Sequence, residues 1–159
     1  LRNTVHVLGI SDQIGLFEAT LQQKIALAIL MPVVASMGGI AGTQTLIIVT
    51  RDIATGRVTT ANIKALINKE VAVSGLNGII WSIVIGLITY YWFSDMLLSL
   101  IIALAIITNL VVAAFSGAFL PLLLSKLRID PALAGGVILT TITDVIGFVA
   151  FLGLASLFI

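Results

Sequence analysis

Residues 96–124 read MLLSLIIALAIITNLVVAAFSGAFLPLLL and contain no charged side chain. A helix needs roughly 20 apolar residues to cross the ~30 Å hydrocarbon core of a bilayer, and this stretch is longer than that. Three further apolar stretches lie around it, at residues 25–49, 71–93 and 131–158. None of them shows the alternating pattern of a barrel strand. The sequence therefore predicts an all-α integral membrane protein.

The composition excludes several classes of protein. Of the 159 residues, 60% are hydrophobic and 9% are charged, and the mean hydropathy is +1.23. Soluble domains carry about 25% charged residues, so neither a soluble enzyme nor a disordered chain fits, and we expect no enzymatic activity. The net charge of +1 makes nucleic acid an improbable partner. Thiolate metal sites are excluded because the chain has no cysteine, and the single histidine, His6, is expected at the membrane interface.

The remaining segments lead to a five-helix interpretation. Residues 1–24 are apolar but interrupted by Asp12 and Glu18, so they fit either a first membrane helix shielded by its neighbours or an interfacial helix. We favour the membrane helix. Residues 59–93 are expected to form an amphipathic interfacial helix that continues into the third span. One transmembrane pore domain, residues 1–159, would thus contain helices at 1–24, 25–49, 59–93, 96–124 and 131–158.

Basic residues indicate the orientation in the membrane. If the chain crosses five times, only Lys24 lies on one side. The opposite side carries Arg2, Arg51, Arg57, Lys64, Lys69, Lys126 and Arg128. The positive-inside rule then predicts a multi-pass protein of the inner (plasma) membrane with a cytoplasmic N-terminus and an outside C-terminus. Because the first residue is Leu1, we expect a piece or a processed form of a longer protein.

Asp144 is the most informative residue for function. It follows Pro131 by 13 residues, which is about 20 Å along a helix and close to the bilayer midplane. A carboxylate facing lipid there costs about 2.5–3.5 kcal/mol, so it should face a cavity, a pore or a partner. Thr140, Thr141 and Gly147 share its helical face. The plainer alternative is a protonated aspartate that is hydrogen-bonded to a neighbouring helix.

Oxygen ligands without nitrogen or sulfur suit hard cations such as magnesium. One carboxylate is a weak site for a divalent ion, but a two-fold homodimer would bring two copies of Asp144 to one axis. Magnesium holds its waters tightly, so the carboxylates would bind the hydrated ion. Manganese, cobalt and calcium remain alternative ions.

Two other motifs contain polar or small residues inside apolar stretches. Gly38 and Gly42 have the GxxxG spacing that allows close helix packing, and Gln44 follows them. This motif fits ordinary packing and a polar path about equally well. Asn109 is expected to form a structural hydrogen bond between helices.

Several ordered motifs resemble the MgtE family of magnesium channels. Residues 32–45 read PVVASMGGIAGTQT and are followed by RDIATG at 51–56. Asn109 with Gly117 and Pro121 is similar to the fourth helix of that family, and TTITDVIG at 140–147 is similar to the fifth. The resemblance extends from about Phe17 to the C-terminus.

The resemblance implies a homodimer with five helices per subunit and a pore on or near the two-fold axis. The second and fifth helices would line this pore, and Asp144 would be the magnesium ligand. The residues implied as pore-lining are Gly38, Gly39, Gly42, Gln44, Thr140, Thr141 and Gly147. Ile40 departs from the family, which has asparagine there. The cytosolic sensing domains that the resemblance implies for the full-length family are absent from this sequence.

The sequence therefore predicts a magnesium-selective channel for passive divalent-cation uptake, embedded in a lipid bilayer as a homodimer. A proton-coupled secondary transporter that uses Asp144 is the main alternative. A membrane subunit that conducts nothing is the third.

Overall fold

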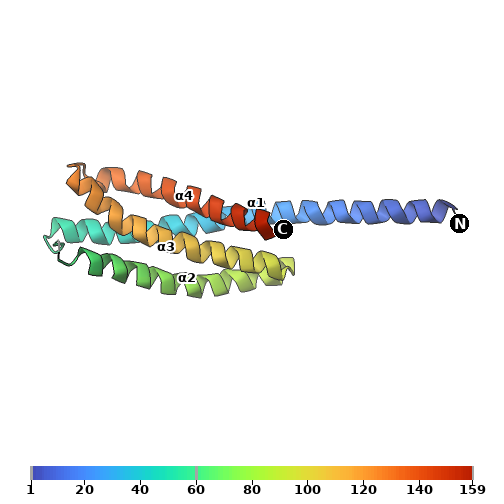
Figure 1. Ribbon diagram of the computed structural model, residues 1–159, viewed down its shortest axis with the longest axis horizontal. Helices are drawn as coiled ribbons and strands as arrows, with labels where there is room; N and C mark the ends of the chain where they lie inside the picture. The colour runs from blue at the N-terminus through green and yellow to red at the C-terminus, as the bar shows by residue number, and fades with distance from the viewer. Residues whose placement is uncertain (1, 60, 159) are drawn as a thin grey trace. The chain divides into compact units, whose positions relative to one another are not determined.

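The chain is helical in the computed structural model, which describes the backbone of residues 2–59 and 61–158 and the side chains of residues 25–59 and 61–158. In chain order the helices are α1 (Arg2–Ala54), α2 (Ile63–Phe93), α3 (Met96–Lys126) and α4 (Pro131–Phe158) (Figure 1). Helices α2, α3 and α4 are long and apolar enough to cross a membrane, and so is the Ile25–Ala54 part of α1. The prediction of an all-α membrane protein is confirmed.

The five-helix interpretation is not confirmed. The described backbone continues as one helix from Arg2 to Ala54, without the turn expected near residue 24. The reason is local, because residues 16–31 contain neither glycine nor proline and are rich in Ala, Leu, Gln and Lys, which favour helix. Four apolar spans are present among the residues from 25 onward whose side chains are described. The side chain of His6 lies outside the described residues.

The chain divides into two compact units, Leu1–Leu30 and Met31–Ile159. The first is helical wherever it is described. The second is a bundle made of the later part of α1 together with α2, α3 and α4 (Figure 1). In this bundle α3 is central, since half of its most apolar window is buried, compared with 17% in α2.

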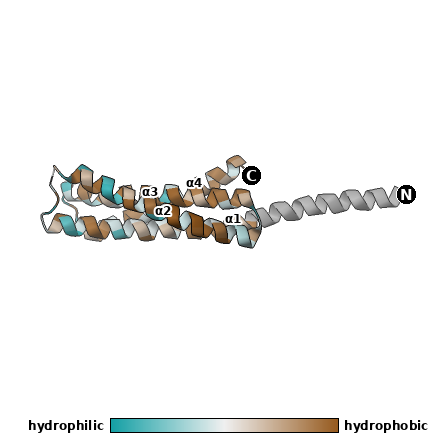
Figure 2. Ribbon diagram, turned by 90° about the horizontal axis from the view of Figure 1, so that it is seen from below, coloured by the Kyte–Doolittle hydropathy of each residue, from teal (hydrophilic) through white to brown (hydrophobic). Residues whose placement is uncertain are grey.

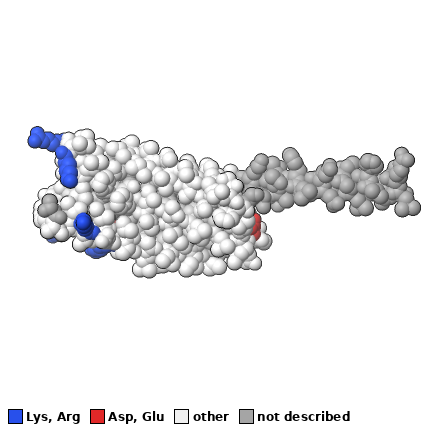
Figure 3. Space-filling view, in the orientation of Figure 1, with Lys and Arg blue, Asp and Glu red and all other residues white. Residues whose placement is uncertain are grey.

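Many large hydrophobic side chains are exposed on the bundle, and Figure 2 shows hydrophobic residues along its helices. The Lys and Arg side chains visible in Figure 3 gather at one end of the bundle, and the α1–α2 and α3–α4 connections there contain Arg57 and Arg128. At the other end, the carboxylate of Asp95 accepts hydrogen bonds from the backbone N–H groups of Leu97 and Leu98, at 2.9 and 3.1 Å. It thereby caps α3. Polar ends and an apolar middle are the pattern of a membrane bundle.

Asn109 joins three helices. It is fully buried on α3, and its side-chain Nδ2 donates a 2.7 Å hydrogen bond to the backbone oxygen of Val34 on α1. Glycines face it from both sides, because a Cβ at Gly38 on α1 or at Gly147 on α4 would collide with the Asn109 side chain. This is an interhelical hydrogen bond of the kind the sequence predicted.

Small residues bring α1 against both α3 and α4. A Cβ at Gly117 on α3 would lie 2.5 Å from the backbone oxygen of Gly42, and a Cβ at Gly135 on α4 would lie 2.8 Å from Leu46. Together with the Asn109–Val34 bond, these contacts show that α1 runs parallel to α3 and antiparallel to α4. The bundle therefore depends on close backbone approach, the usual role of small residues between membrane helices.

We predict that Gly117→Ala destabilises the bundle, because its new Cβ meets the α1 backbone, which cannot move aside without shifting the helix. Overpacking of this kind costs roughly 1–3 kcal/mol. Gly75→Ala on α2 is the matched control, since a Cβ there has nothing within 4 Å. Unfolding of the two variants in detergent micelles should show the loss only for Gly117→Ala. Equal stability of the two variants would contradict the close α1–α3 contact.

Candidate functional site

Asp144 lies near the middle of α4 and its side chain is exposed on the bundle surface. Among the described residues, no other charged side chain occupies the central part of a helix. The structure gives the Asp144 carboxylate no hydrogen-bond or ion-pair partner within the described part of the chain. An unpaired carboxylate at this depth is costly when it faces lipid, so it marks a site that something else must complete.

Two exposed threonines stand beside Asp144 on α4. The Thr140 hydroxyl donates to the backbone oxygens of Gly136 and Val137, each at 3.1 Å, and the Thr141 hydroxyl donates to the backbone oxygen of Val137 at 2.9 Å. Each hydroxyl donates its proton to a backbone oxygen of its own helix, so the lone pairs of the hydroxyl oxygen remain available to accept a hydrogen bond. Together, Thr140, Thr141 and Asp144 form a surface stripe of hydrogen-bond acceptors.

Helix α1 borders this stripe through Gly39. A Cβ at Gly39 would lie 3.8 Å from Thr143 Oγ1 and 4.0 Å from Thr140 Cγ2. Thr143 itself is fully buried and directs its hydroxyl to the backbone oxygen of Thr140 at 3.0 Å. The structure therefore brings Gly39, from the predicted set, next to the α4 threonines.

The outer face of α1 carries a further exposed row with a spacing of four residues: Ser36, Ile40 and Gln44. Ile40, at the position where the resembled family has asparagine, is 63% exposed. Ser36 was missed by the sequence reasoning, although its spacing from Ile40 and Gln44 was a usable signal. Its hydroxyl donates to the backbone oxygen of Val33 at 3.2 Å, so its oxygen lone pairs also remain free.

Three of the predicted pore-lining glycines lie inside the bundle instead of on this face. Gly38 and Gly147 contact Asn109, whereas Gly42 contacts Leu139 and the α3 backbone. Their direct role is to let α1, α3 and α4 approach one another. They can shape the wall of a pore only by setting the distance between α1 and α4.

One chain contributes few ligands for a metal ion. The described residues contain no group of three or more Asp, Glu, His or Cys side chains placed to hold a metal. The Asp144 carboxylate with its hydroxyl neighbours is an all-oxygen donor set, which suits hard cations such as magnesium or calcium. The donor set fits such an ion in kind, but one chain supplies only one charged ligand.

Comparison of the sequence with known proteins identifies a family. The sequence profile of the MgtE family, described as a divalent cation transporter, matches residues 31–154. Proteins named magnesium transporter MgtE from Bacillus subtilis and Thermus thermophilus are 34% and 32% identical over 92% and 89% of this chain. The protein of the same name from Enterococcus faecalis is 29% identical over 98% of the chain.

The chain spans about a third of the length of these curated relatives, from 31% to 35%. The matched residues 31–154 contain Asn109, Asp144 and the glycines that surround Asn109. The match covers more than half of the chain, and the chain belongs to the MgtE family of divalent cation transporters.

Proposed function

We propose that this chain forms the pore of a homodimeric magnesium channel in which Asp144 of both subunits holds a hydrated Mg²⁺ ion. The observation that carries the proposal is the Asp144 carboxylate, exposed near the middle of an apolar helix without a partner among the described residues. The names of the relatives, all magnesium transporters, support magnesium as the transported ion.

A second copy of the chain would complete the site. Two-fold symmetry places the same surface of each copy at one axis. The acceptor stripe of α4 and the exposed row of Ser36, Ile40 and Gln44 on α1 would therefore each lie close to the same residues of the second subunit. Two carboxylates at about 5 Å from a divalent ion each contribute a gross attraction of several kcal/mol at an effective dielectric of about 20. The same pairing would remove both carboxylates from contact with lipid.

The threonine oxygens suit a hydrated ion better than a bare one. Mg²⁺ dehydrates reluctantly and usually keeps several waters, whose O–H groups point away from the ion. Free lone pairs on Thr140 and Thr141 can accept hydrogen bonds from these waters. Selectivity would therefore depend on the width of the water-bearing site as well as on its charge.

We further propose that the basic end of the bundle is cytoplasmic, as the positive-inside rule favours, and that the protein resides in the plasma membrane. This places the C-terminus outside. The expectation of a cytoplasmic N-terminus depends on a crossing by residues 1–24, whose side chains lie outside the described residues. An inside-negative potential contributes about 2.3 kcal/mol per charge per 100 mV, or roughly twice that for a divalent ion, so uptake would need no other energy source.

We predict that Asp144→Asn lowers Mg²⁺ flux into liposomes at least tenfold, because the charge that holds the ion is lost while the size of the side chain is kept. Asp130→Asn is the matched control. It makes the same chemical change at the start of α4, where Asp130 accepts from the backbone N–H of Ala132 and asparagine caps equally well. Equal flux in the parent protein and in Asp144→Asn would refute Asp144 as the ion ligand.

The same liposomes separate a channel from a proton-coupled transporter. For a channel, Mg²⁺ entry should follow an imposed membrane potential, and a pH dye inside the liposomes should report no proton movement. Proton movement in fixed proportion to Mg²⁺ would instead identify Asp144 as an alternating proton and metal site.

We predict that Thr141→Cys cross-links two subunits under mild oxidation, because the proposed axis lies along the exposed stripe of α4. The chain has no cysteine of its own, so the new thiol is the sole reactive one. Leu87→Cys, exposed on α2, is the control and should stay monomeric on a denaturing gel. The reverse pattern, with cross-linking at position 87 and none at position 141, would place the dimer contact elsewhere.

A further inference from the structure

A recess lies at the basic end of the bundle, well away from Asp144. Its volume is about 320 Å³, and its walls come from the end of α1, the α1–α2 connection, the start of α2 and the end of α3. The apolar part of the wall includes Val58, Ile63, Ile67 and Phe119, and the polar part consists of Ser125 and Lys126. The recess is thus an apolar space with a cation at a polar edge.

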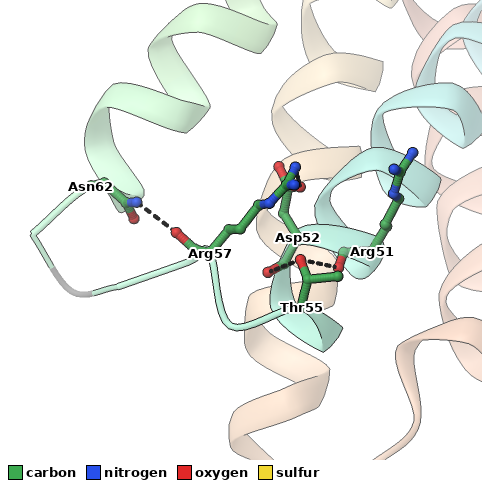
Figure 4. Close-up of polar contacts among 5 residues, drawn as sticks. All are labelled: Arg51, Asp52, Thr55, Arg57 and Asn62. Carbon is green, nitrogen blue, oxygen red and sulfur yellow. Dashed lines mark hydrogen bonds and ion pairs between the residues drawn. The ribbon is translucent and has the colours of Figure 1, made fainter.

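Side-chain hydrogen bonds hold the α1–α2 connection that forms one wall. Asn62 donates from Nδ2 to the backbone oxygen of Arg57 at 2.7 Å, and its Oδ1 accepts from the backbone N–H of Thr59 at 2.8 Å (Figure 4). The backbone N–H of Arg57 also donates to the backbone oxygen of Asp52 at 2.9 Å. Val58 lies between these anchored residues, so the apolar wall is present before anything binds.

The charge beside the recess is positive and uncompensated. Lys126 is exposed in the last turn of α3 and has no ion pair among the described residues. The ion pair that the described residues do form at this end joins Arg57 to Asp52, at 4.0 Å, and Lys64 on α2 adds a further positive charge next to Ile63. An anionic ligand is therefore favoured at this edge.

We propose that the recess binds an anionic phospholipid, with an acyl chain against Ile67 and Phe119 and the headgroup phosphate at Lys126. A free phosphate would leave the apolar walls unused. Basic pockets between membrane helices are a known way to hold lipid headgroups. The proposal goes beyond ion transport and does not depend on it.

Native mass spectrometry tests the site. The protein is released from detergent with equal amounts of phosphatidylglycerol and phosphatidylcholine that carry the same acyl chains. We expect at least fivefold more retained phosphatidylglycerol. Lys126→Gln should abolish this preference, whereas the matched control Lys69→Gln should keep it, because Lys69 carries the same charge near this end but does not line the recess. An equal loss of the phosphatidylglycerol preference in both variants would overturn the proposal that the recess is a defined lipid site.

A second variant tests the apolar part of the site. Ile67→Trp should fill the recess and reduce phosphatidylglycerol retention at least fivefold, and an unchanged thermal unfolding midpoint would show that the bundle remains intact. If Ile67→Trp unfolds, Val58→Trp makes the same test from the connection. Undiminished retention in a folded variant would overturn the proposal. Glycerol phosphate binding as tightly as the whole lipid would also overturn it, because the acyl chain would then contribute nothing.

Discussion

The hydrogen bond from Asn109 to the backbone oxygen of Val34, at 2.7 Å, is the contact on which the rest of the bundle depends. A buried amide inside a membrane bundle must find its partner in protein, because lipid offers none. Gly38 and Gly147 leave room for the amide from either side. The Asn109 side chain thus sets the spacing of α1, α3 and α4 at the middle of α3. Two turns further along α3, the contact between Gly42 and Gly117 keeps α1 close to α3.

That spacing decides which residues of α4 remain outside. Leu139, Thr143 and Gly147 are buried by α1 and α3. Asp144 directly follows buried Thr143 but is exposed, on a face of α4 that nothing in the described part of the chain covers, and Gly147, which was expected to share this face, is buried. Gly38, Gly42 and Gly147, which the sequence predicted as pore-lining, let these helices approach one another closely.

Hydropathy was sufficient to predict α2, α3 and α4, since their apolar stretches end at Asp95, Lys126 and Asp130, where charge or a cap stops the pattern. For residues 1–24 hydropathy left two alternatives open, because Asp12 and Glu18 interrupt the apolar pattern, and the side chains of these residues lie outside the described part of the chain. Hydropathy also could not predict which face of each helix is buried. Both faces of a membrane helix are apolar, so the burial of Thr143 beside exposed Thr140 and Thr141 depends on packing that the pattern does not encode.

Glu70 on α2 and Asp144 on α4 are acidic residues within apolar helices, and they differ in their distance from basic residues. Glu70 is buried on α2 within two turns of the basic end, next to Lys69 in sequence. Asp144 is 16 residues from Arg128, or about 24 Å along the chain at helical rise, which is too far for an ion pair. Fixed cations of the described chain therefore cannot serve as its counterion. Under the proposed function, a cation that arrives from solution would balance the charge of Asp144, and the exposed position of this residue near the middle of α4 would place the charge on the path of the ion.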